Sequence, residues 1–185
     1  VPSFALLKGW RNYLCLSRLH QAVGSQRSLL EPDKYDELTG LFEWAGRTQD
    51  GTLADLAVTP SSEVWDEVSA EADLCPRLQC SHFDACFLFR ARRRAAEADV
   101  VVVNHHLLAA DLAVRRASEN WREAAVLPPY DRLILDEAHH LEDVAAGHLG
   151  AQVTSRGIRR LLGRFERNGK GLLPTLAADL VAQGD

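Results

Sequence analysis

Residues 98–108 read ADVVVVNHHLL, and the four valines at 100–103 form an all-apolar, β-branched run of strand length. A second short apolar run, RLIL at 132–135, follows a stretch of helical character at 105–117. Short runs that are apolar at every position are typical of parallel strands covered on both faces. The sequence therefore predicts an α/β domain in which a helix connects two parallel strands.

The segment before the valine run is mostly helical in pattern. Apolar spacing and helix-start signals predict helices at 13–23, 33–46, 61–72 and 84–98. A helix-rich segment followed by strand, helix, strand and helix indicates part of an α/β domain that carries an insertion. Residues 150–185 are also helical in pattern, and more basic.

Composition is that of a globular protein, with 185 residues of which 46% are hydrophobic and 25% charged. No apolar run is long enough to span a membrane, and no secretory signal opens the chain, so we expect a cytoplasmic protein with no membrane partner. The chain begins with Val1 and contains no methionine. We therefore expect it to be a piece of a longer protein.

Charge is unevenly distributed along the chain. The net charge of −5 alone argues weakly against nucleic-acid binding, but basic clusters occur in residues 1–30, at 90–94 (RARRR) and at 156–170. Such clusters can follow a phosphate backbone. Solvated helix faces are an equally good interpretation of any one cluster.

The sequence LILDEAHHLEDV at 133–144 places two carboxylates directly after the second apolar run. Ligands of open parallel sheets bind beyond the carboxyl ends of the strands. Asp136 could there hold Mg²⁺ on nucleotide phosphates, Glu137 could orient or deprotonate a water, and His139 could sense the nucleotide. The alternative is a helix N-terminus, where acidic residues favour the helix dipole. His140 is predicted to be structural.

A phosphate-binding loop of the type G-x-x-x-x-G-K-[ST], the usual companion of such a carboxylate pair, is missing. Lys8 and Lys170 each lie beside a glycine, but neither has the required spacing or a following Ser or Thr. We therefore expect this chain alone to hydrolyse ATP poorly, which agrees with a piece of a longer protein.

Four cysteines occur in the chain, and three of them lie within twelve residues. They are Cys15, Cys75, Cys80 and Cys86. An even number in so short a chain without a secretory signal favours one four-thiolate metal site over disulfides. Zinc usually takes pairs with two to four intervening residues, and no C-x-x-C is present, so the uneven spacing slightly favours an iron–sulfur cluster. Spacing alone leaves both metals open, and His82 could replace one ligand.

Taken together, several segments closely resemble one family in both sequence and order. They are KGWRNYLC at 8–15, LCPRLQC at 74–80, the cysteine at 86, ADVVVVNHHLL at 98–108 and LILDEAHHLEDVA at 133–145. The family is that of the XPD/DinG-type iron–sulfur superfamily 2 DNA helicases, and the DinG-like bacterial branch looks nearest. The resemblance covers about residues 4–149.

The resemblance implies a partial RecA-like parallel-sheet motor domain with an inserted, mostly helical [4Fe–4S] domain. The implied divisions are 1–14 and 98–149 for the motor, 15–97 for the cluster domain and 150–185 for the start of a helical arch domain. It further implies ATP-dependent 5′-to-3′ unwinding with Mg²⁺, at a junction of single-stranded and duplex DNA. The rest of the helicase would lie in the same longer chain, at work on the bacterial nucleoid.

Residue by residue, the resemblance makes the four cysteines the cluster ligands and Asp136, Glu137 and His139 the residues of the DEAH box. Lys8, Asn12 and Tyr13 fall on a K-G-R-x-N-Y-x-C pattern that contacts DNA, although burial in the core is as good an interpretation of Tyr13. Trp10 stands where the family has arginine, so Arg11 receives no DNA role.

Arg90 and Arg93, which follow the last cysteine, are further expected DNA contacts. Two other functions stay open from the residues themselves. One is a DNA-binding module whose metal centre senses redox state, and the other is a zinc-stabilised interaction domain.

Overall fold

The computed structural model describes residues 1–25 and 32–149. Its contacts divide the chain into two compact units, Val1–Val144 and Ala145–Asp185. The first unit holds two short strands, β1 (Phe4–Leu6) and β2 (Val100–Val102), and most of the helices. The predicted helical segment at 150–185 lies outside the described residues.

The helices lie close to the predicted ranges. They are α1 (Leu16–Ser25), α2 (Pro32–Ala45), α3 (Ser62–Val68), α4 (Phe87–Glu97), α5 (His105–Ser118) and α6 (Leu141–Leu149). Short 3₁₀ turns occur at Trp10–Asn12, Leu53–Asp55, Arg77–Gln79 and Ala138–His140. None of these described helices is long and apolar enough to cross a membrane.

β1 and β2 pair in parallel, in the register Phe4↔Val100, Ala5↔Val101 and Leu6↔Val102. Asp99 orders the start of the pair, because its Oδ2 accepts hydrogen bonds from the Ser3 backbone N–H and hydroxyl, both at 2.8 Å. The chain therefore leaves β1, forms the helical segment and returns to the neighbouring strand. This small parallel sheet confirms the predicted mixed α/β class.

One strand prediction is wrong. Residues 132–135 form no strand, and Leu133, Ile134 and Leu135 are 51%, 95% and 38% exposed. A strand needs a neighbour for its backbone N–H and C=O groups. The sheet in the described part of the chain consists of β1 and β2, and neither strand pairs with this segment.

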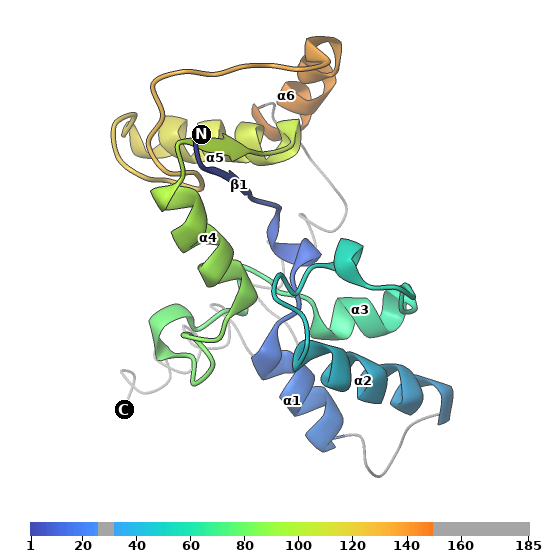
Figure 1. Ribbon diagram of the computed structural model, residues 1–185. Helices are drawn as coiled ribbons and strands as arrows, with labels where there is room; N and C mark the ends of the chain where they lie inside the picture. Colours follow the sequence, from blue (N-terminus) through green and yellow to red (C-terminus); the bar gives the residue numbers. More distant parts are fainter. Residues whose placement is uncertain (26–31, 150–185) are drawn as a thin grey trace, which may run out of the picture. The chain divides into compact units, whose positions relative to one another are not determined.

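Three helices of the first unit pack on one another, and a fourth packs against the sheet. α1, α2 and α3 contact one another (Figure 1), and α4 contacts β1. Tyr13 and Leu14, expected within a helix, are extended and form antiparallel bridges to Thr52 and Ser69. Both side chains are at most 2% exposed, so this extended pair is the centre of the core.

Candidate functional site: a four-cysteine cavity and a DEAH segment

All four cysteines line one cavity of about 370 Å³. Each is half-buried, and each is a free thiol. Cys15 directly precedes α1, Cys86 directly precedes α4, and Cys75 and Cys80 lie on the loop between α3 and α4. The structure thus brings the distant first cysteine to the other three.

Hydrogen bonds of the extended Tyr13–Leu14 segment place Cys15. The Leu14 N–H donates to the Gly51 carbonyl at 2.9 Å, and the Cys15 N–H donates to the Val68 carbonyl at 2.8 Å. On the same side of the segment as the bond to Val68, the Ala70 N–H donates to the Tyr13 carbonyl at 2.8 Å. Cys15 is therefore held at the C-terminal end of α3, where the cysteine loop begins.

The cysteine loop is built from consecutive tight turns. The Cys80 N–H donates to the Arg77 carbonyl, the Phe83 N–H to the Cys80 carbonyl and the Cys86 N–H to the Phe83 carbonyl, at 3.0–3.2 Å. The Arg77 N–H also donates to Cys75 Sγ at 3.4 Å. Arg77 has a φ of +54°, a left-handed conformation that is uncommon for residues other than glycine. These turns direct three thiols to the same side of a short segment.

The cavity wall is mostly apolar. Trp10, Leu16, Leu74, Phe83, Leu88 and Phe89 contribute to it, and Arg18 and Glu71 add one charge of each sign. Burial raises the pKa of the Cys15 thiol, which therefore favours the protonated form. Four free thiols that line one mostly apolar cavity could supply the ligands of a thiolate-bound metal centre.

His82 lines the same cavity, but its ring is engaged elsewhere. It stacks on the His20 ring, with 4.8 Å between centroids and 10° between planes. The edge of the His20 ring in turn meets Phe42 at 5.2 Å. Because its ring is stacked in this way, His82 forms part of the cavity wall, and the four cysteine thiols remain the candidate metal ligands.

Three arginines of α4 lie over aromatic rings, and two of these rings, those of Trp10 and Phe83, line the cavity. Arg93 lies 5.9 Å from the Phe83 ring centre and donates to the Asp84 carbonyl at 3.2 Å. Arg92 lies 5.2 Å from the Trp10 ring, and its Nε is buried without a hydrogen-bond partner among the described residues. Arg90 lies 6.0 Å from the Phe87 ring. Of the two expected DNA contacts, Arg93 thus borders the aromatic wall of the cavity, whereas the ring beside Arg90 does not line it.

The N-terminal residues assigned to DNA differ in their surroundings. Lys8 is half-buried and its Nζ donates to the Thr52 hydroxyl at 3.2 Å, while Asn12 is exposed and donates to the Gly9 carbonyl at 3.2 Å. Tyr13 is only 2% exposed, and its hydroxyl accepts from the Lys8 N–H at 3.0 Å. A base cannot stack on a ring so placed, so Tyr13 serves the core instead.

The DEAH residues lie apart from the lining of the cysteine cavity. Asp136, Glu137 and His139 are all exposed. The Glu137 N–H donates to Asp136 Oδ1 at 3.0 Å, and Glu137 Oε2 lies 3.2 Å from His139 Nδ1. Glu137 has a φ of +47°. The ligand atoms of Glu137, His139 and His140 lie within 4.8 Å of one another, so His140, expected to be structural, joins this exposed group.

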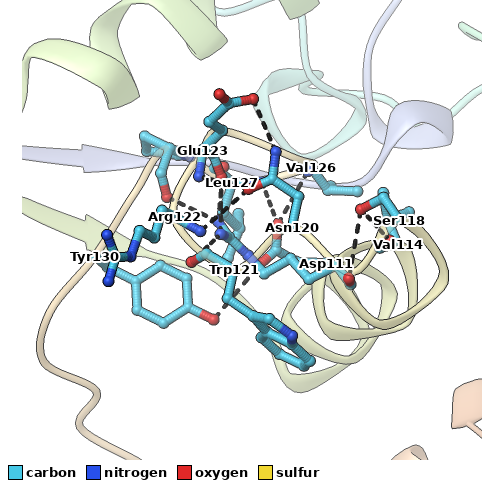
Figure 2. A network of polar contacts seen from close by, with 12 residues as sticks. Asp111, Val114, Ser118, Asn120, Trp121, Arg122, Glu123, Val126, Leu127 and Tyr130 are labelled. Carbon is cyan, nitrogen blue, oxygen red and sulfur yellow. Dashed lines mark hydrogen bonds and ion pairs between the residues drawn. The ribbon is translucent and has the colours of Figure 1, made fainter.

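Sequence reasoning missed a buried polar network at the C-terminal half of α5 (Figure 2). Asp111 and Arg115 are 0% and 2% exposed, and they bind the loop that leads toward the DEAH segment. A signal was present, because Asp111 and Arg115 continue the i, i+4 spacing of the buried Leu107. An acid and a base on the buried face of a helix indicate a paired internal charge.

Comparison with known proteins gives consistent matches. Residues 55–158 match the model of the DEAD_2 family. The chain is 38% identical over 153 residues to the ATP-dependent DNA helicase YoaA of Escherichia coli, covering 82% of this chain and 23% of that protein. It is 37% identical over 179 residues to the ATP-dependent helicase DinG of Mycobacterium tuberculosis, covering 90% of this chain and 26% of the relative.

A further relative carries a different activity in its name. The 3'-5' exonuclease DinG of Bacillus subtilis is 32% identical over 165 residues, which cover 87% of this chain and 16% of that protein. The chain therefore spans about a quarter or less of the length of these curated relatives.

Proposed function

The chain belongs to the DEAD_2 family and is a DinG-like relative of the XPD-type helicases, and from this premise we propose that it is part of an ATP-dependent 5′-to-3′ DNA helicase. Its partner would be DNA at a junction of single strand and duplex. The remaining motor elements, including the phosphate-binding loop, would belong to the same longer protein, at work on the nucleoid in the bacterial cytoplasm.

The observation that carries the proposal is the convergence of Cys15, Cys75, Cys80 and Cys86 on one cavity. We propose that these thiolates hold a [4Fe–4S] cluster. A cavity of about 370 Å³ is larger than a single ion requires, and only one pair of the ligands, Cys75 and Cys80, has the close spacing typical of zinc. When bound, the cluster would crosslink the two ends of the helical segment and supply electron-transfer chemistry.

The divisions of the chain follow from this proposal. Residues 15–97 would form the cluster domain, inserted between motor segments 1–14 and 98–149, and 150–185 would begin the arch domain. After the helical segment the chain returns as β2, which pairs with β1, and this pairing supports such an insertion. The exposed apolar side chains of Phe4, Leu6, Val100 and Val102 alternate along the two strands, which supports a sheet face that other motor elements cover.

The DEAH residues would act on bound ATP. Asp136 would hold Mg²⁺ on the phosphates, Glu137 would orient and deprotonate the attacking water, and His139 would connect the site to nearby loops. The distance of 3.2 Å between His139 Nδ1 and Glu137 Oε2 supports a connection between these two residues. Because all three are exposed, they would be accessible to a nucleotide held by other parts of the motor.

The DNA path would pass the cluster domain. Arg90 and Arg93 lie on α4, directly after the last cysteine, and Lys8 and Asn12 lie just before the first. Their cationic and amide groups suit phosphate oxygens. This placement couples the proposed DNA contacts to the integrity of the cysteine cavity.

Anaerobic purification tests the cluster directly. We expect brown protein with about four iron and four sulfide ions per chain, and loss of the visible absorbance when any of the four cysteines becomes serine. His82→Ala is the matched control, because His82 lines the cavity without belonging to the thiolate set. A colourless protein that contains zinc would support the interaction domain instead.

The motor role has its own test. In the longer protein, Glu137→Gln should abolish DNA-stimulated ATP hydrolysis while nucleotide binding persists. Redox-dependent DNA binding in a wild-type protein without any ATPase activity would favour the sensing module.

A further inference from the structure

The loop from Glu119 to Tyr130, which connects α5 to the DEAH segment, contains no helix or strand. Glu119 ends α5 in the left-handed conformation, with a φ of +53°, and the chain then turns back along the helix. Leu127 is the loop's buried apolar anchor, at 5% exposed. Such a segment needs other partners for its backbone groups.

Asp111 and Arg115 supply those partners. Figure 2 shows Asp111 and the loop residues Trp121, Glu123 and Leu127 in one network of polar contacts. Asp111 Oδ1 accepts hydrogen bonds from the Val126 N–H at 2.9 Å and from the Leu127 N–H at 2.8 Å. Its Oδ2 accepts from Arg115 Nε at 2.6 Å. The carboxylate therefore bridges the guanidinium and two consecutive loop amides.

Arg115 completes the arrangement from the other side. Its Nη1 donates to the carbonyls of Trp121 and Glu123, at 3.1 and 2.8 Å. Its Nη2 donates to the carbonyls of Leu127 and Pro128, at 3.3 and 3.4 Å. A planar guanidinium can serve several carbonyls at once, which a lysine ammonium on one flexible stem cannot reproduce.

Tyr130 is the last residue that the network holds. Its hydroxyl lies 3.4 Å from Asp111 Oδ2, and its ring lies 5.2 Å from the Arg115 guanidinium carbon. Residues 131–135 then make no hydrogen bond or ion pair with other residues of the described chain, and all are exposed. The network thus determines where the segment that carries Asp136 and Glu137 departs from α5.

We propose that Asp111 and Arg115 are positioning residues that anchor the DEAH segment to α5. Because Asn104 caps the N-terminus of α5 directly after β2, through its Oδ1 and the Leu107 N–H at 2.8 Å, the anchor links the end of the sheet to the DEAH segment. The pair acts on the loop backbone and not only within itself. This role in ATP hydrolysis rests on the proposed function, whereas the anchoring does not.

Substitutions distinguish the anchor from a simple ion pair. Arg115→Lys keeps the charge and loses the four-carbonyl fork, so it should behave like Arg115→Met. The exchange Asp111→Arg with Arg115→Asp would face the carboxylate toward carbonyls and the guanidinium toward N–H groups, so it should not restore the wild type. If the two residues formed only an ion pair, Arg115→Lys would preserve that pair and the charge exchange would restore it.

Amide hydrogen exchange on this chain tests the anchoring. In Arg115→Lys and in the charge exchange, the amides of Val126 and Leu127 should exchange at least about tenfold faster than in the wild type. Exchange in α2 should not change, because α2 shares no hydrogen bond with the network in the described chain. Wild-type rates at Val126 and Leu127 in either variant would overturn the proposal.

ATP hydrolysis by the longer protein tests the positioning. Arg115→Lys should lower kcat by roughly ten- to a hundredfold, as misplaced catalytic groups do, and leave KM within about twofold. Leu38→Ala, a core truncation in α2 chosen to match the loss of Tm, should keep the wild-type kcat. An equal fall of kcat in both variants would reduce the network to a structural role. A wild type without ATPase would refute the proposed function, while the exchange data would still decide the anchoring.

Discussion

Gly51 has a φ of +61° and lies against the ring of Phe87, which is 3% exposed. A Cβ added to Gly51 would lie 2.6 Å from Phe87 Cδ1 and closer still to Cγ and Cδ2, so Gly51→Ala forces the ring to move. The left-handed backbone costs about 1–2 kcal/mol for alanine. Overpacking adds about 1–3 kcal/mol. We therefore expect the free energy of unfolding to fall by about 2–5 kcal/mol.

The displacement should also reach the cysteine cavity. Phe87 directly follows Cys86 and begins α4, so a displaced ring moves one wall of the thiolate set. Gly51→Ala should therefore reduce incorporation of the proposed cluster as well as stability.

Urea denaturation of the metal-free protein measures the first effect, and visible absorbance after reconstitution measures the second. Gly40→Ala is the matched control, because Gly40 lies inside α2 with nothing within 4 Å of an added Cβ. That variant should be more stable by about 0.5–1 kcal/mol.

A double-mutant cycle isolates the contact with the ring. Phe87→Ala alone should cost about 3–5 kcal/mol, but it removes the atoms that an alanine at 51 would strike. The double variant should then be more stable than the sum of the single effects by about 1–3 kcal/mol. Strict additivity, or a Gly51→Ala variant with the wild-type denaturation midpoint, would refute the reasoning.

Three further predictions concern pH and helix capping. The two hydrogen bonds from Ser3 lower the pKa of Asp99, so the stabilisation that Asp99 provides is present above the ordinary carboxyl pKa and is lost as the pH falls through the lowered value. The Tm difference between wild type and Asp99→Asn should therefore shrink with acidification, and a constant difference would contradict this. Burial raises the pKa of Cys15, so a metal ion that binds there must displace a proton. The affinity for Co²⁺, measured by its thiolate charge-transfer band, should therefore rise from pH 6 to pH 8, and a pH-independent affinity would exclude a thiol ligand. Ser61 caps α3 through the Val64 N–H and also binds Glu37, so Ser61→Ala should cost about 0.5–2 kcal/mol in urea denaturation, whereas an unchanged midpoint would show that the cap contributes nothing.

The amino-acid sequence alone predicted the helices and the strand at the valine run to within a few residues. It also identified the DEAH motif and the cysteine group. These are local properties, because the periodicity of apolar residues and the chemistry of neighbouring side chains depend only on residues close together in the sequence. The helix predicted from residue 13 fails only at its start, where tertiary bridges to Thr52 and Ser69 hold Tyr13 and Leu14 extended.

Only the tertiary structure decided which distant groups meet. Residues 132–135 have the composition of a buried strand, yet they stay exposed because pairing depends on a neighbour and not on the segment itself. Asp111 and Arg115 form their network only because the fold brings the backbone of the loop at 121–130 within hydrogen-bond distance of them. The cavity that collects Cys15 with the later cysteines likewise depends on hydrogen bonds between segments far apart in the chain, which no local pattern specifies.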